Sequence, residues 1–198
     1  MKTIAACLLW FACSALAQPD PSIVRKLQSG GYVLYMRHAS TDFSQNDANS
    51  RSYEDCANQR NLTDKGREEA RSVGAHIKRL HIPIGEVLAS PFCRTMETAR
   101  LAFGKAKPMT EVRGGPASAN DPARYASLKQ LLSTKTGAKD NRVISSHGNP
   151  FHAVAGPPYL AEGEIAVVEP EGNGRFKILT RIRLEDWSGL PSSAGPAS

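Results

Sequence analysis

Three short apolar runs, each followed by a helical pattern, constrain the fold of this chain most strongly. The runs cover residues 31–36, 86–90 and 142–146, and the first is apolar throughout after a Gly-Gly pair. Continuous apolar character of this kind is typical of strands buried on both faces of a parallel sheet. Strands that alternate with helices therefore predict one three-layer α/β domain, with a mostly parallel central sheet and helices on both faces.

Four helices are predicted from apolar residues at helical spacing, the longest over residues 64–80. Their predicted starts, each a cap or first-turn residue, are Thr63, Ser90-Pro91, Asp121-Pro122 and Asn149-Pro150. Residues 164–169 and 175–182 flank a turn rich in Pro and Gly and predict a C-terminal hairpin at a sheet edge. Long polar stretches at 39–61 and 104–120 predict functional loops.

Residues 1–17 have the pattern of a secretory signal peptide. Lys2 precedes an apolar stretch over residues 4–12, and Ala15-Leu16-Ala17 forms a small-x-small cleavage site. The stretch is too short for a stable membrane insertion. We therefore expect cleavage near Ala17 and a periplasmic or secreted domain over residues 18–187. Residues 188–198, rich in Ser, Pro, Gly and Ala, predict a disordered tail.

Basic and imidazole side chains follow all three predicted strands. Arg37 and His38 follow the first, Arg94 lies in the first turn after the second, and His147 follows the third. Because ligands of open α/β sheets bind beyond the carboxyl ends of strands, neighbouring strands would bring these residues to one site. Two guanidiniums beside helix N-terminal N–H groups favour phosphate, and a neutral histidine nitrogen there is a nucleophile.

Four segments occur in a fixed order along the chain: Leu34-Tyr35-Met36-Arg37-His38-Ala39, NLTDKGREEA at 61–70, ASPFCRTMETA at 89–99, and Ser145-Ser146-His147-Gly148. Together they resemble the signatures of the histidine phosphatase superfamily, which has the phosphoglycerate mutase-like fold. The resemblance extends from residue 31 to about residue 187. The family triplet is most often Arg-His-Gly, whereas this chain has Ala39.

The resemblance implies a role for each matching position. His38 is the implied nucleophile that forms a phosphohistidine, Arg37 and Arg94 clamp the phosphate, and His147 completes the pocket. Water then hydrolyses the intermediate, with no metal or other cofactor. Glu111 is a loose match to the family's proton donor, the alternative being a solvated charge at the end of a strand. Thr41 is a second phosphate-binding candidate, or a residue that only stabilises its turn.

A phosphatase is favoured over a mutase because residues 40–61 do not resemble the mutase pattern. The expected substrate is a phosphorylated small molecule, or the phosphorylated head group of a glycan or lipid. Two alternatives stay open. One is a catalytically weak protein that binds phosphorylated ligands. The other is an envelope-binding protein that uses the net charge of +6 to hold anionic components.

Metal and nucleic-acid binding are not favoured. The chain has no His-x-x-x-His or paired Cys motif of the kind that holds zinc. The basic residues of the 64–80 segment and its end are not accompanied by aromatic stacking residues, and a solvated helix face explains them; they are Arg67, Arg71, Lys78 and Arg79.

Two of the four cysteines, Cys7 and Cys13, lie within the expected signal peptide. In an oxidising compartment we expect Cys56 and Cys93 to form a disulfide that ties the 39–61 loop to the wall of the site. The alternative is a reactive thiol at Cys93, which adjoins Arg94 at a predicted helix N-terminus.

Overall fold

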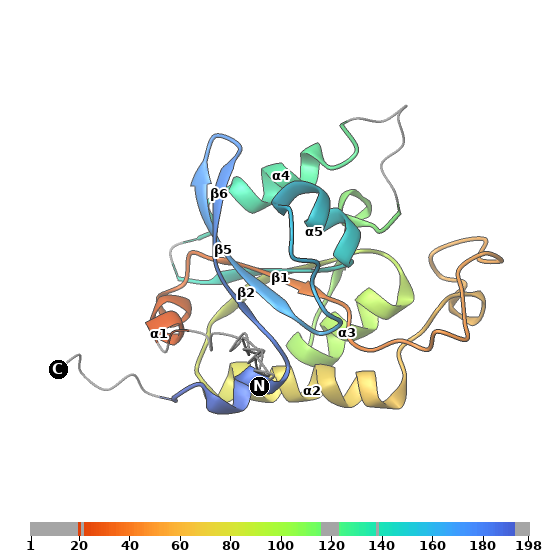
Figure 1. The fold of residues 1–198 in the computed structure, drawn as a ribbon, viewed down its shortest axis with the longest axis horizontal. Helices are drawn as coiled ribbons and strands as arrows, with labels where there is room; N and C mark the ends of the chain where they lie inside the picture. The colour runs from red at the N-terminus through yellow and green to blue at the C-terminus, as the bar shows by residue number, and fades with distance from the viewer. Residues whose placement is uncertain (1–19, 21, 116–122, 138, 193–198) are drawn as a thin grey trace, which may run out of the picture.

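A six-stranded sheet lies at the centre of the molecule, in the order β3-β2-β4-β1-β5-β6 (Figure 1). The structure is a computed structural model that describes residues 20, 22–115, 123–137 and 139–192. Its strands are β1 Val33–Arg37, β2 Ile84–Ala89, β3 Lys107–Pro108, β4 Asn141–Ser146, β5 Ile165–Gly172 and β6 Arg175–Ile182. The first four in this list pair in parallel, and β5 and β6 run antiparallel. The predicted mostly parallel α/β fold is confirmed.

Helices cover both faces of the sheet. They are α1 Ser22–Ser29, α2 Asp64–Arg79, α3 Cys93–Phe103, α4 Ala126–Ser133 and α5 Gly148–Ala155. The first three pack with one face of the sheet, and α4 and α5 pack with the other (Figure 1). The alternation along β1 shows this division, because Leu34 and Met36 join the first cluster while Val33 and Tyr35 join the second.

β1 lies between β4 and β5, and β4 lies between β1 and β2. The three predicted strands that carry basic and imidazole residues at their ends are therefore neighbours. Arg37 of β1 pairs with Ser146 of β4, and Ala89 of β2 pairs with Ser145. The residues that follow these three strands consequently meet at one edge of the sheet.

Several predicted boundaries differ from the structure. The second predicted helix, α3, begins at Cys93 and not at Pro91 after a Ser90 cap, because the Ser90 hydroxyl bonds to the His147 ring instead of capping a helix. The hairpin is confirmed, but its turn is only Asn173-Gly174, and Pro170 lies within β5. Helix α1 was not predicted. The predicted helix start at Asp121-Pro122 lies outside the described residues.

The predicted disordered tail begins too early. A 3-10 helix spans Glu185–Gly189, and Leu190 beyond it is buried in the cluster that contains α1, α2 and α3. The Arg79 guanidinium also donates hydrogen bonds to the carbonyls of Trp187 and Leu190. Buried apolar surface and these hydrogen bonds order residues 188–190, which composition alone does not reveal. Residues 193–198 lie outside the described part.

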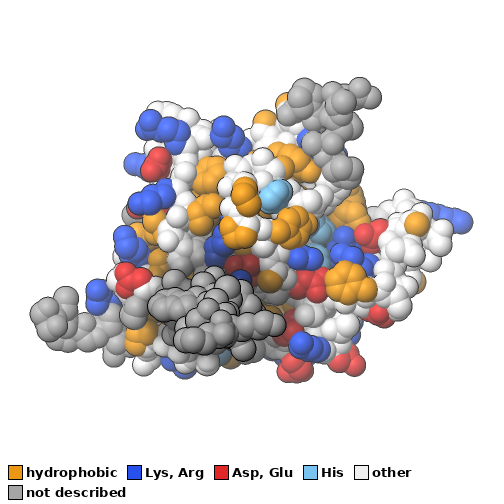
Figure 2. Space-filling view, in the orientation of Figure 1, with side chains coloured by type: hydrophobic (Ala, Val, Ile, Leu, Met, Phe, Trp, Pro, Cys, Tyr) orange, Lys and Arg blue, Asp and Glu red, His pale blue; other side chains and the backbone are white. Residues whose placement is uncertain are grey.

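The basic side chains of α2 are largely engaged with acidic ones. Arg67 pairs with Asp64 and Glu97, and Arg71 pairs with Glu68. Figure 2 shows Lys and Arg side chains spread over one face of the molecule and interspersed with Asp and Glu. This arrangement agrees with a solvated helix face. Among the helices of the described residues, none is long and apolar enough to cross a membrane.

Candidate active site

A cavity of about 290 Å³ opens at the carboxyl ends of β1 and β4 and the start of α3. It brings together the four residues predicted with most support from the sequence, Arg37, His38, Arg94 and His147. The other residues that line it are Asp47, Arg60, Phe92, Gly114, Gly115, Gly148, Asn149 and Tyr159. The cavity therefore combines two imidazoles with three guanidiniums.

His38 is fixed in one orientation at the end of β1. Its side chain is buried, its backbone N–H donates to the Ser146 carbonyl at 2.9 Å, and its Nδ1 lies 2.9 Å from the Ala39 carbonyl. Because a carbonyl oxygen only accepts, Nδ1 carries the proton and Nε2 keeps its lone pair. Burial, together with the charges of Arg94, Arg37 and Arg60, lowers the pKa of His38 to about 3. The ring is therefore neutral at ordinary pH, which is the nucleophilic form.

The turn after His38 is held from two sides. The Ala39 N–H donates to Thr98 on α3 at 3.2 Å, and the Ser40 N–H donates to Glu69 on α2 at 3.0 Å. Gly66 of α2 packs so closely that a Cβ there would lie 2.1 Å from the Ser40 carbonyl oxygen. These contacts explain why residue types in the 61–70 and 89–99 segments matter for the position of His38.

The Ala39 methyl has a place of its own in this turn. The residue is fully buried and packs in a small cluster with Leu62 and Ala70. The departure from the family's usual glycine is therefore accommodated by apolar contacts.

Arg37 and Arg94 approach the cavity from different elements. Arg37 donates to the Leu160 carbonyl at 2.7 Å, and its guanidinium lies 5.3 Å from the Tyr159 ring centre. Arg94, in the first turn of α3, is buried and lies over the Phe92 ring at 4.7 Å. Fixed guanidiniums of this kind match the oxygens of a bound phosphate.

His147 faces His38 across the cavity. The two ring centres are 5.4 Å apart with planes at 71°, and His147 Nε2 lies 2.8 Å from the Ser90 hydroxyl. Burial is the main cause that lowers the pKa of His147 well below its usual value. His147 is also the N-cap residue of α5, so the cavity includes Gly148 and Asn149 at the helix N-terminus, where backbone N–H groups favour an anion.

Two predicted site residues are not brought into the cavity. Glu111 lies in a 3-10 helix over Thr110–Val112, is exposed, and is not a lining residue. The run around it forms only the two-residue β3 and this short helix, so its carboxyl does not extend from a strand end toward the site. Thr41 is buried, but its hydroxyl donates to Glu162 at 2.8 Å, as does its N–H at 3.3 Å. Its observed role is to hold a turn.

Glu162 is one residue that the sequence did not indicate. Its carboxylate lies 3.5 Å from the Arg37 guanidinium and 3.8 Å from His38 Nδ1. It therefore links the turn at Thr41 to the first arginine of the site. Glu162 lies in the connection before β5, more than a hundred residues from Arg37, and no motif surrounds it.

Asp47 and Arg60 were also missed, and both come from the 39–61 loop. The Arg94 guanidinium donates to Asp47 at 2.9 Å and to the Arg60 carbonyl at 3.3 Å, and the Arg60 N–H donates to Asp47 at 2.9 Å. Burial raises the pKa of Asp47, but these hydrogen bonds and the two arginine charges together lower it below its usual value. The only sequence signal for Arg60 is its position directly before the 61–70 segment.

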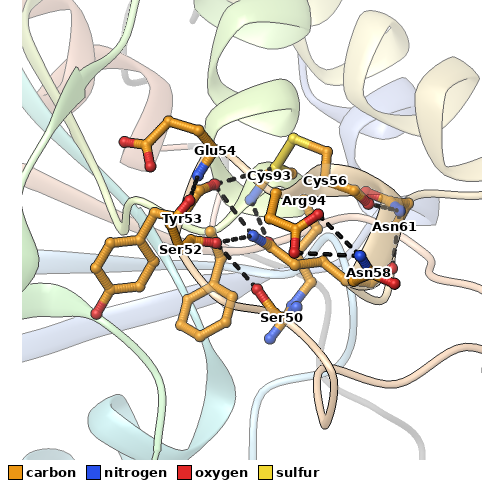
Figure 3. Close-up of a disulfide and its surroundings, with 12 residues drawn as sticks. Ser50, Ser52, Tyr53, Glu54, Cys56, Asn58, Asn61, Cys93 and Arg94 are labelled. Atoms are coloured by element: carbon orange, nitrogen blue, oxygen red, sulfur yellow. Dashed lines mark hydrogen bonds between the residues drawn. A yellow bond between two sulfur atoms is a disulfide. The ribbon is translucent and has the colours of Figure 1, made fainter.

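The predicted Cys56–Cys93 disulfide is present and joins the loop to α3 directly beside Arg94 (Figure 3). Gln59 adds a second link, because its buried side chain accepts from the Cys93 N–H at 2.9 Å and donates to the carbonyls of Ser52 and Tyr53. The loop that carries Asp47 and Arg60 is thus attached to the helix that carries Arg94.

A larger cavity of about 770 Å³ lies beside the disulfide and is lined by residues that include Cys56, Cys93, Glu97 and Arg100. No histidine lines it, whereas both candidate histidines, His38 and His147, line the smaller cavity. Within the described ranges, no group of three His, Cys, Asp or Glu side chains is placed to hold a metal ion.

Comparisons with known proteins agree with this geometry. The family model described as histidine phosphatase superfamily (branch 1) matches residues 33–115. Among curated proteins, none matches the chain. The structure of the protein histidine phosphatase SixA with tungstate is 24% identical, with a TM-score of 0.56 over 78% of this chain and 98% of that one.

Two further solved structures share the fold. A mutant of phosphoserine phosphatase from Entamoeba histolytica, in complex with phosphoserine, is 14% identical, with a TM-score of 0.51 over 78% of this chain and 98% of that one. TTHB049 from Thermus thermophilus is 16% identical, with a TM-score of 0.53 over 77% of this chain and 99% of that one. The chain is therefore similar to the histidine phosphatase superfamily over residues 33–115 and shares the fold of these solved structures, and the four ordered segments meet at one cavity.

Proposed function

We propose that this protein is an exported, metal-independent phosphatase that hydrolyses phosphate monoesters through a phosphohistidine at His38. The observation that carries the proposal is the state of His38. The ring is buried and neutral, its Nδ1 is hydrogen-bonded to the Ala39 carbonyl, and its Nε2 lone pair is available in a cavity lined by arginines.

The reaction has two steps. In the first, His38 Nε2 attacks phosphorus, the bond to the leaving oxygen breaks, and that oxygen takes up a proton. Arg37 and Arg94 stabilise the charge on the phosphoryl oxygens, and the N-terminus of α5 adds N–H groups. Asp47 lines the cavity and Glu111 does not. Burial raises the pKa of Asp47, but hydrogen bonds and charges from Arg94 and Arg60 lower it overall and keep its carboxyl ionised, so we propose that the leaving oxygen takes its proton from solvent water. In the second step, water attacks phosphorus, the P–N bond breaks, and orthophosphate and neutral His38 are released.

The substrate we propose is a phosphorylated small molecule, or a phosphorylated head group of a glycan or lipid. The similar structures include a protein histidine phosphatase and a phosphatase bound to phosphoserine, so the shared fold serves different leaving groups. A cavity of about 290 Å³ has room for a phosphate and part of a small leaving group.

The first test is phosphate release by the purified chain 18–198. We expect hydrolysis of para-nitrophenyl phosphate, and an unchanged rate after dialysis against EDTA, because the proposed nucleophile and clamps are all side chains. A panel of phosphorylated sugars, nucleotides and phosphoamino acids then ranks natural substrates. No turnover of any compound would contradict the function, and loss with EDTA that a divalent cation restores would contradict metal independence.

The proposed export has a separate test. Residues 1–17 carry the signal-peptide pattern, and a disulfide such as Cys56–Cys93 is typical of oxidising compartments. We expect the protein recovered from the envelope or medium of expressing cells to begin at Gln18. Intact-mass measurement of each cell fraction checks this, and a full-length chain confined to the cytoplasm would contradict it.

A further inference from the structure

Arg60 is held at the catalytic cavity without an ion pair among the described residues. It lines the cavity, and its backbone N–H and carbonyl bond to Asp47 and Arg94 at 2.9 and 3.3 Å. Its guanidinium carbon lies 5.0 Å from the centre of the Phe43 ring. Within the described part of the chain, the guanidinium has no ion pair, and its Nε, like those of Arg37 and Arg94, is buried without a hydrogen-bond partner. Buried donors are normally satisfied, so this arrangement indicates a partner that comes from a ligand.

The other two arginines of the cavity have carboxylates beside them. Arg37 lies 3.5 Å from Glu162, and Arg94 lies 2.9 Å from Asp47. His38 and His147 contribute no charge, because burial keeps both rings neutral. The three guanidiniums therefore face two carboxylates, Glu162 and Asp47, which leaves a net positive charge, and Arg60 is the one that forms no ion pair within the described residues.

The charge of Arg60 also reaches the reacting centre. It is one of the charges that disfavour protonation of both His38 and His147, and it acts on Arg94 as well. The guanidinium therefore lies close enough to act on an anion bound between these side chains. Its backbone bonds and the disulfide-anchored loop fix it there in advance of binding.

We propose that Arg60 is a third anion-binding residue of the catalytic pocket, and that it supplies the net positive charge which holds the substrate's phosphoryl group. The proposal rests on the function proposed above and deepens it. Arg37 and Arg94 orient the phosphoryl oxygens, and Arg60 provides the unbalanced charge that draws a dianionic phosphate into the cavity.

The test is the dissociation constant for inorganic phosphate, measured by calorimetry on the full mature chain. Arg60→Gln keeps most of the side-chain length and removes the charge, and we expect it to weaken phosphate binding about tenfold or more. Arg60→Lys keeps the charge but loses the planar guanidinium, and we expect it to recover part of the affinity that Arg60→Gln loses. Arg71→Gln, on the exposed face of α2, is the matched control and keeps the wild-type constant.

A second variant separates charge from packing. Phe43→Leu removes the aromatic ring over which Arg60 lies but keeps the guanidinium, and we expect phosphate affinity within about threefold of wild type. Equal affinity of wild type and Arg60→Gln would overturn the proposal. So would a loss in Phe43→Leu or Arg60→Lys as large as that in Arg60→Gln, because Arg60 would then act only through the structure of the loop.

A third outcome would also overturn it. If Arg60→Gln binds inorganic phosphate normally but loses kcat/KM for 3-phosphoglycerate relative to glycerol 3-phosphate, Arg60 recognises an anionic leaving group and not the phosphoryl group. Because phosphate binding can be measured without turnover, the proposed role of Arg60 and the proposed phosphatase function are tested independently. A wild type that binds phosphate through Arg60 but hydrolyses no ester contradicts the function alone.

Discussion

Replacing His38 by alanine is expected to lower kcat/KM for para-nitrophenyl phosphate by a factor on the order of 10⁴ or more. The substitution removes the only atom proposed to bond to phosphorus, and no other side chain of the described cavity carries out the same step. Arg37 and Arg94 remain in His38→Ala, so we expect it to bind inorganic phosphate. The rate falls because the nucleophile is lost, while the anion site persists.

Steady-state kinetics and phosphate calorimetry on the same preparation check this expectation. His76→Ala, on α2 and outside the cavity lining, is the matched control and keeps the wild-type rate. Circular dichroism confirms that both variants are folded. A His38→Ala protein that retains a tenth of the wild-type rate would exclude His38 as the nucleophile.

The second large effect is expected from the double variant Cys56→Ser/Cys93→Ser. The disulfide closes a segment with a sequence separation of 37 residues, and loop entropy gives a stabilisation of about 4 kcal/mol. For a domain of this size, that loss corresponds to a melting temperature lower by roughly 10 °C. Denaturant and thermal unfolding of the wild type, with and without reductant, and of the double variant measure it.

Activity is expected to fall with the disulfide even where the protein remains folded. The closed segment contains Gln59, which bonds to the Cys93 N–H, and Arg60, whose carbonyl accepts from Arg94. Without the covalent link, this segment positions Arg94 less well, and we expect kcat/KM to fall about tenfold. Reductant has no further effect on the double variant. Wild-type stability and activity that are both insensitive to reductant would contradict this role of the loop.

The sheet could be predicted from local patterns, and so could the edge at which the candidate catalytic residues meet. The run at 31–36 is apolar on both faces, the run at 142–146 has Val143 and Ile144 on opposite faces, and in the structure β1 and β4 are buried at the centre of the sheet. Thr63 accepts from the Gly66 N–H at 2.9 Å, which is the predicted N-cap of α2. The positions of these strands and of the start of α2 are encoded by residues only a few positions apart, through apolar periodicity and capping.

Side chains supplied by loops could not be placed in the same way. The family resemblance implies Glu111 as the proton donor, yet Glu111 is exposed in a 3-10 helix and does not line the cavity. Asp47 and Arg60 reach the cavity from a loop that is held by a disulfide and the buried Gln59 amide, and Glu162 contacts Arg37 from the connection before β5. These contacts join residues far apart in sequence, and no local pattern encodes them.

The start of α3 illustrates the same limit on a smaller scale. Ser90 has the residue type of an N-cap, and Pro91 that of a first helical residue. In the folded chain the Ser90 hydroxyl lies 2.8 Å from His147, and the helix begins at Cys93. A tertiary contact with the catalytic cavity therefore overrides a local capping preference.

The most direct test of the central claim is to trap the enzyme during turnover. Wild type is mixed with substrate, quenched at alkaline pH, where phosphohistidine survives, digested and analysed by mass spectrometry, with His38→Ala and His147→Ala treated in parallel. We expect one phosphoryl group on the peptide that contains His38 and none in His38→Ala. Phosphate release with no phosphorylated peptide, or a phosphoryl group on His147 instead, would contradict the account.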